Sequence, residues 1–140
     1  MSDSVFFDSN SLIYRFSPLE TRKQGLATTL LREAVLRRNG VISYQVVQEV
    51  LNVGFKSTKT LLTMPEAALL VESFSIDFQI VSWSLLLVEQ ALTIKERFRF
   101  QWYDSLIVAA ALQAQCDVLY TEDLQHGQRI EGLTVVNPFI

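Results

Sequence analysis

The stretch Y-D-S-L-I-V-A-A-A-L at residues 103–112 carries one charged residue, Asp104, near its start and is otherwise almost wholly apolar. A run of this length without a polar face predicts a buried helix, which we place from Trp102 or Tyr103 to Gln115. Asp104 then lies in the first helical turn, where the helix dipole favours a negative charge. The sequence therefore predicts a fold built around one central apolar helix.

Short apolar runs alternate with longer amphipathic runs along the rest of the chain, and this alternation is typical of a parallel sheet flanked by helices. The expected strands are Val5–Asp8, Val41–Ser43, Phe78–Val81, Asp117–Tyr120 and Thr134–Val136. The other expected helices are Ser11–Phe16, Glu20–Arg38 (ended by Asn39-Gly40), Ser43 or Tyr44 to Val53 (ended by Gly54), a Thr63-capped helix to about Phe74, and Ser84 to about Glu96. Phe55–Lys59 is an expected loop. The predicted fold class is α/β, with a central parallel sheet of four to five strands flanked by helices.

The length of 140 residues, the hydrophobic content of 49% and the mean hydropathy of +0.23 indicate a compact domain with its own core. We therefore expect a single domain over residues 1–140. A net charge of −3 gives no global basic signature for nucleic acid, but a nuclease needs only a local basic rim. Because Cys116 is the only cysteine, an internal disulfide is excluded.

Neither a membrane span nor a signal peptide is expected from the sequence. No apolar run approaches the roughly 18 residues of a membrane span. The N-terminus starts M-S-D-S and has no basic region leading into a long apolar stretch, unlike a signal peptide. We therefore expect a soluble, cytoplasmic protein.

Four carboxylates stand far apart in the chain but in matching local settings. Asp8 ends the first expected strand, and Asp123 lies just beyond the fourth. Asp104 opens the central helix, and Glu49 projects from the helix after the second strand. Right-handed crossovers would bring these four elements to one edge of the sheet, where ligands of α/β folds bind.

Such a cluster of acids needs compensation. Two like charges about 4 Å apart repel by roughly 4 kcal/mol at an effective dielectric near 20. Either some of the acids are protonated or a divalent cation neutralises them. Oxygen ligands without His or Cys suit Mg²⁺ or Mn²⁺, which can activate water for hydrolysis of a phosphodiester. Taken singly, each acid also has a structural explanation as a cap or turn residue, and Glu49 has the least local support.

At these residues the chain resembles the PIN-domain ribonucleases, in particular the VapC-type toxins of prokaryotic toxin–antitoxin modules. The matching motifs, in the family's order, are F-F-D-S-N at 6–10, I-S-Y-Q-V-V-Q-E-V at 42–50, Y-D-S-L-I-V-A-A-A-L at 103–112, L-Y-T-E-D at 119–123 and N-P-F at 137–139. The resemblance implies a PIN-like three-layer fold and a metal-dependent endoribonuclease. The catalytic and metal-binding acids that it implies are Asp8, Glu49, Asp104 and Asp123, with Mg²⁺ or Mn²⁺ as cofactor.

The resemblance also implies supporting roles for Asn10 and Thr121, an RNA substrate, a homodimer and inhibition by a cognate antitoxin. The motif T-E-D places Glu122 beside Asp123. Asp123 fits the family position better, but Glu122 could share or replace its role. Because some PIN domains are catalytically silent, a non-catalytic interaction or RNA-binding module is the alternative function. A phosphatase with Asp8 as nucleophile is weaker, since Asn10 stands where such an enzyme would need a second aspartate.

A short basic segment precedes the central helix. Its residues Lys95, Arg97 and Arg99 are followed by aromatic side chains, so we regard them as candidates for contact with RNA. His126 is the only histidine. We interpret it as a polar turn residue before Gly127, because metal-activated water requires no histidine as general base.

Overall fold

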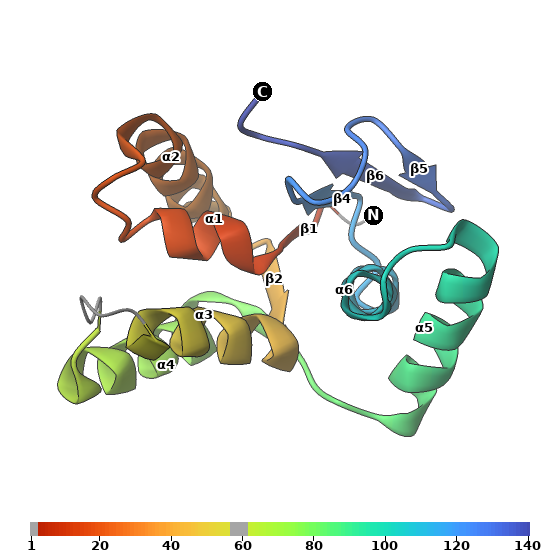
Figure 1. Ribbon diagram of the computed structural model, residues 1–140, viewed down its shortest axis with the longest axis horizontal. Coiled ribbons are helices and arrows are strands. Elements are labelled where there is room, and N and C mark those ends of the chain that lie inside the picture. The colour runs from red at the N-terminus through yellow and green to blue at the C-terminus, as the bar shows by residue number, and fades with distance from the viewer. Residues whose placement is uncertain (1–2, 57–61) are drawn as a thin grey trace.

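The computed structural model describes residues 3–56 and 62–140 (Figure 1). The helices are α1 (Ser9–Tyr14), α2 (Thr21–Arg37), α3 (Tyr44–Lys56), α4 (Met64–Asp77), α5 (Leu85–Phe98) and α6 (Trp102–Gln113). The strands are β1 (Val5–Phe7), β2 (Gly40–Ser43), β3 (Gln79–Val81), β4 (Val118–Tyr120), β5 (Arg129–Ile130) and β6 (Leu133–Val136). The predicted α/β class is confirmed. No helix in these residues is long and apolar enough to cross a membrane.

The strands form a single sheet in the order β3-β2-β1-β4-β6-β5. All neighbours pair in parallel except β5, which is antiparallel to β6. The described residues therefore form six strands, where the sequence predicted four to five. The missed strand β5 has only two residues, and it reaches β6 through the turn Glu131–Gly132, in which Glu131 adopts a φ of 56°. A pairing this short leaves no alternation to detect.

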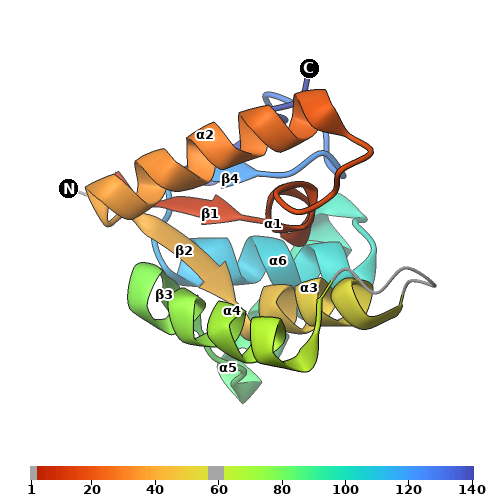
Figure 2. The ribbon, with the colours of Figure 1, turned by 90° about the vertical axis from the view of Figure 1, so that its left-hand side faces the viewer.

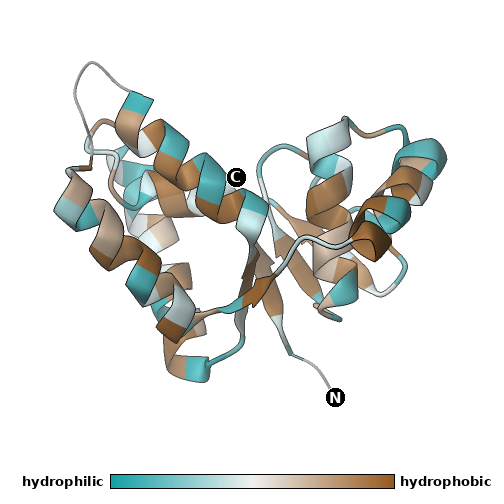
Figure 3. Cartoon of the chain, turned by 90° about the horizontal axis from the view of Figure 1, so that it is seen from below, coloured by the Kyte–Doolittle hydropathy of each residue, from teal (hydrophilic) through white to brown (hydrophobic). Residues whose placement is uncertain are grey.

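Two helices sandwich the sheet: α2 lies in front of it and α6 behind it in the view of Figure 2. Successive side chains along each strand point to opposite faces of the sheet. Phe7 stacks on Tyr120 of β4 at 5.3 Å between ring centroids, while Phe6, which points to the opposite face, is completely buried. The prediction of a central apolar helix is correct, since residues 105–111 of α6 are all buried. The strands accordingly form the hydrophobic centre of the molecule (Figure 3).

Several helix ends differ from the prediction. Helix α1 begins at Ser9 rather than Ser11, so Asp8 is its N-cap and accepts a hydrogen bond from the Ser9 N–H. Gly54 does not end α3, which continues to Lys56; residues 57–59 of the predicted loop lie outside the described part of the chain. A Cβ at Gly54 would lie 2.5 Å from Leu62, so this glycine permits close packing instead.

The end of α2 also differs in detail. Arg38, with a φ of 56°, is the left-handed residue that ends the helix, rather than the predicted Asn39-Gly40 pair. Gly40 already belongs to β2, and a Cβ there would lie 2.7 Å from the ring of Phe78. The predicted cap of α4 is correct: Thr63 and Glu66 form a reciprocal capping box.

Candidate metal centre

Three carboxylates meet at the carboxyl ends of the two central strands β1 and β4. Asp8 directly follows β1, Asp123 lies in the loop after β4, and Asp104 projects from the first turn of α6. One carboxylate oxygen from each lies within 4.8 Å of the other two. Oxygens bound to one Mg²⁺ are at most about 4.2 Å apart, so a small closure would place all three on one ion. The residues present therefore fit a divalent metal site.

Asp8 is the most constrained of the three acids, with an exposure of 4%. Its Oδ1 accepts a hydrogen bond from the Ser9 N–H at 2.7 Å, and its Oδ2 accepts one from the Thr121 hydroxyl at 2.8 Å. Its pKa is raised to about 7, since burial, the largest cause, and the charges of Glu49 and Asp123 together outweigh the lowering effect of these two hydrogen bonds. Asp8 is thus oriented as an ion ligand but costly to ionise without a neighbouring cation.

Asp104 and Asp123 are more exposed than Asp8, but their pKa values are raised as well. Burial raises the pKa of both carboxyls; Asp123 and Glu49 add to the effect at Asp104, and Glu122 adds to it at Asp123. Asn10 donates weakly to Asp123, with Nδ2 3.5 Å from Oδ2. All three acids therefore hold protons more tightly than free aspartate does, as expected of an acid cluster without its cation.

Glu49 lies beside this trio but outside its close group. Its Oε2 accepts a hydrogen bond from the Ser9 hydroxyl at 3.1 Å, and its Oε1 accepts one from Gln45 Nε2 at 2.9 Å. The same Gln45 nitrogen donates to the backbone carbonyl of Tyr103 at 3.1 Å, which ties α3 to the start of α6. Because Glu49 is not among the acids whose oxygens lie within 4.8 Å of one another, it is better placed to contact an ion through water than directly. Its predicted role as a ligand remains a prediction.

Glu122 points away from the acid cluster. It accepts hydrogen bonds from the Tyr14 hydroxyl and from Lys23 Nζ, the latter at 3.1 Å, and Lys23 also donates to the Tyr14 hydroxyl at 3.1 Å. Of the two adjacent acids, the geometry brings Asp123 to the other aspartates and ties Glu122 to α1 and α2. Thr121, predicted as a supporting residue, contacts Asp8 and also accepts from the Asp123 N–H at 3.1 Å.

Two of the three residues of the predicted basic segment, Lys95 and Arg97, contact other protein groups. Lys95 Nζ donates to the carbonyl of Phe100 at 3.0 Å, and Arg97 lies 3.9 Å from Glu131 and over the ring of Phe98. Arg99 is the left-handed residue that ends α5. The Lys95 side chain and the Arg99 backbone therefore take part in the turn before α6. Contact with RNA stays a prediction for all three residues.

Four contributors were missed in the sequence: Ser9, Gln45, Tyr14 and Lys23. Ser9 lies inside the D-S-N motif, so its neighbourhood was a signal. Gln45 likewise lies inside the I-S-Y-Q-V-V-Q-E-V motif at 42–50, four residues before Glu49. Tyr14 and Lys23 act across elements, and nothing in their local pattern distinguishes them. His126 is exposed, as a turn residue would be, and its Nδ1 accepts a hydrogen bond from the Asn137 N–H at 3.0 Å.

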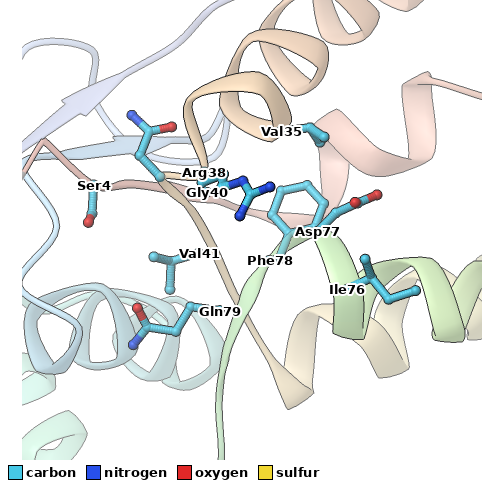
Figure 4. A pocket seen from close by; sticks show the side chains of 10 residues that line it. Ser4, Val35, Arg38, Gly40, Val41, Ile76, Asp77, Phe78 and Gln79 are labelled. Carbon is cyan, nitrogen blue, oxygen red and sulfur yellow. The ribbon is translucent and has the colours of Figure 1, made fainter.

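Two cavities lie at opposite edges of the sheet. An open cavity of about 550 Å³ is lined by Asp104 and Asp123 together with Phe100, Gln101 and Leu124, so the acids are accessible to a large ligand. A second cavity of about 480 Å³ lies at the amino ends of β1 and β2, near Ser4, Gly40 and Phe78 (Figure 4). Among the residues that the structure describes, Asp77 is the one acid that lines it. Since ligands of parallel sheets bind at the carboxyl edge, the first cavity marks the candidate site.

Comparisons with known proteins agree with this geometry. A comparison with curated proteins finds no significant match. Among solved structures, the chain is similar to one from a toxin–antitoxin complex of Klebsiella pneumoniae, with 24% identity and a TM-score of 0.72 over 97% of this chain and 98% of that one. It is also similar to VapC20 of Mycobacterium tuberculosis, a toxin that cleaves the sarcin–ricin loop, with 18% identity and a TM-score of 0.67 over 86% and 90% of the two chains.

A third similar structure is VapBC2 of Rickettsia felis bound to a DNA fragment from its promoter, with 17% identity and a TM-score of 0.62 over 94% and 96% of the two chains. At these identities the likeness shows a shared fold. The family model described as "PIN domain" matches residues 5–129, which contain every acid of the site. This chain belongs to the PIN-domain family, as its motifs predicted.

Proposed function

We propose that the chain is a single-domain, metal-dependent endoribonuclease of the VapC type, with Mg²⁺ or Mn²⁺ as its cofactor. The observation that carries this proposal is the approach of Asp8, Asp104 and Asp123 to within 4.8 Å at the carboxyl edge of the sheet. Membership of the PIN-domain family and the likeness to a sarcin–ricin loop cleaving toxin support RNA as the substrate.

The residues of the site would have separate roles in metal binding and in the activation of water. A divalent ion bound by the three aspartates supplies charge that acidifies water and stabilises a phosphodiester oxygen. Ser9 and Thr121 fix the two oxygens of Asp8, so this ligand loses little freedom when it binds. Glu49, held by Ser9 and Gln45, is placed to orient a water molecule at the edge of the cluster and to accept its proton.

The remaining parts of the proposal concern partners and location. The similar structures from Klebsiella pneumoniae and Rickettsia felis are described as a toxin–antitoxin complex and as VapBC2, which supports a cognate antitoxin for this chain. A homodimer and a cytoplasmic location complete the proposal. Size-exclusion chromatography coupled to light scattering of the purified chain would test the dimer.

Cleavage of single-stranded RNA by the purified protein in Mn²⁺ tests the enzymatic proposal. Asp8→Asn and Asp104→Asn should each abolish cleavage, because each removes a negative ligand from the cluster. Asp117→Asn is the matched control, since Asp117 is exposed and lies at the other end of β4. Parent-like cleavage by both site variants would show that the site is assigned wrongly.

The same acids could instead accept an arginine from a partner protein, which is the non-catalytic alternative. The pKa of about 7 at Asp8 is the observation in its favour, because protonation of Asp8 removes one of the like charges without a metal and leaves Asp104 and Asp123 to pair with the arginine. Calorimetric titration with Mn²⁺ separates the two functions. Binding that disappears in Asp104→Asn supports the nuclease, whereas no binding by the parent supports the module.

A further inference from the structure

The cavity at the acid cluster extends beyond the metal ligands. Asp104 and Asp123 form one side of it, and Phe100, Gln101 and Leu124 form the rest. Its volume of about 550 Å³ lies within the range of small-ligand sites, roughly 300–1,000 Å³. A phosphodiester held at the aspartates would therefore have room beside it for one of its attached nucleosides.

The aromatic wall of this cavity is held in place. Phe100 stacks on Phe98 with ring centroids 5.4 Å apart and ring planes inclined by 9°. Lys95 donates to the Phe100 carbonyl at 3.0 Å, and Arg97 lies 4.8 Å from the centre of the Phe98 ring. A ring fixed in this way loses little conformational entropy when a ligand stacks on it. The basic segment thus orders an aromatic surface beside the acids.

The side-chain amide of Gln101 lines the cavity and stabilises no part of the fold by a hydrogen bond. Gln101 occupies the N-cap position of α6, where Ser, Thr, Asp or Asn would normally bind the first N–H groups, yet its side chain makes no capping bond. Within residues 3–56 and 62–140, its exposed amide has no hydrogen bond at all. An amide offers two donors and one acceptor oxygen, which can match the edge of a nucleobase.

We propose that this cavity binds the unpaired nucleobase next to the scissile phosphate, with Phe100 and Leu124 against the base faces and Gln101 at its hydrogen-bonding edge. The proposal rests on the ribonuclease function proposed above and specifies how the substrate is chosen. No Lys or Arg of the described ranges 3–56 and 62–140 lines the cavity. A neutral planar base therefore suits the walls better than a second phosphate does, and the base must be unstacked to enter.

A cycle of one protein change and one RNA change tests the aromatic contact. The cut site is first mapped on a random-sequence single-stranded RNA in Mn²⁺, and an abasic nucleotide is then placed on either side of it. Phe100→Ala with intact RNA, and the parent with abasic RNA, should each raise KM about tenfold, as expected for loss of one stacked base. Combined, the two changes should do no more than either alone, because both remove the same contact.

Four further variants keep this test interpretable. Phe100→Leu preserves apolar bulk against Phe98 but removes the aromatic face, so it should reproduce the KM effect with a thermal midpoint close to that of the parent. Phe55→Ala removes an exposed aromatic ring that does not line the cavity, and should leave KM unchanged. Gln101→Ala should flatten the base preference at the cut site, whereas the exposed Gln125 in the neighbouring loop can be changed to Ala without effect.

RNA affinity provides a readout that does not depend on cleavage. In EDTA at low ionic strength, fluorescence anisotropy should show the same roughly tenfold weakening for Phe100→Ala with intact RNA and none with abasic RNA. If the parent cleaves RNA but Phe100→Ala and Phe100→Leu keep its KM and cut pattern, the base site is refuted and the nuclease stands. Additive effects of the protein and RNA changes would equally refute it. A parent that cleaves no RNA in Mn²⁺ removes both proposals.

Discussion

The buried Asp8 should make the metal-free protein less stable as the pH rises towards neutrality. Its pKa is about 7 in the folded chain and near 3.8 when unfolded. The folded state therefore binds the proton more tightly, so the free energy of unfolding falls as the pH rises between these values. Since one pKa unit corresponds to about 1.36 kcal/mol, ionising Asp8 costs on the order of 4 kcal/mol by pH 7. That is a large part of a typical domain stability of about 5–15 kcal/mol.

The substitution Asp8→Asn tests this value because it removes the charge and keeps the shape. The amide oxygen still accepts from the Ser9 N–H, but the amide nitrogen now faces the Thr121 hydroxyl, which must turn. Allowing about 1 kcal/mol for that rearrangement, we expect the variant to gain roughly 3 kcal/mol at pH 7.5 and almost nothing at pH 4.

Urea unfolding in EDTA at several pH values between 4 and 8 measures the effect. The parent should lose up to about 1.4 kcal/mol per pH unit between pH 5 and 7 more than Asp8→Asn does. Asp117→Asn, a matched exposed aspartate, should keep the parental slope. Parallel curves for the parent and Asp8→Asn would refute the assignment of the raised pKa to Asp8.

Three other predictions concern metal binding, the Lys23–Glu122 ion pair and two glycines. Mn²⁺ must bind ionised Asp8, so below pH 7 its affinity should fall by up to about tenfold per pH unit, and calorimetry in buffers of different ionisation enthalpy should show about one proton released. Lys23→Met removes the cation that pairs with Glu122, so the pKa of the neighbouring Asp123 should rise in an NMR titration, whereas the exposed Lys56→Met should leave it unchanged. Gly40→Ala should lower the free energy of unfolding by about 1–3 kcal/mol, because the new Cβ would collide with the ring of Phe78. Gly25 lies within α2, and a Cβ there would meet no other atom, so Gly25→Ala should raise the free energy of unfolding by about 0.5–1 kcal/mol.

The acid trio could be predicted from the sequence because each member marks an element boundary. Asp8 follows an apolar strand, and Asp104 opens an apolar helix. Both signals are local, and the handedness of crossovers in parallel sheets then fixes which edge the residues share. The hydrophobic pattern of a few residues therefore sufficed to place groups that are about a hundred residues apart in the chain.

The choice between Glu122 and Asp123 could not be made from the sequence. In a loop, side chains follow no regular alternation, so the sequence does not indicate which of two adjacent acids faces the acid cluster. Their separation depends on Tyr14 and Lys23, which reach Glu122 from α1 and α2. Contacts of this kind depend on the packed structure, as does the unused amide of Gln101, whose freedom is visible only once its lack of partners is known.

The three aspartates differ in burial in a way that links folding to substrate access. Asp8 is buried, Asp104 is half-buried and Asp123 is exposed, and only the last two line the open cavity. Asp8 would thus hold the ion from the buried side, with both oxygens fixed, and Asp104 and Asp123 would hold it from the side that faces the cavity. The burial that makes Asp8 costly to ionise also increases the energy released when a cation neutralises it. In this arrangement a bound cation would both stabilise the folded chain and face the substrate.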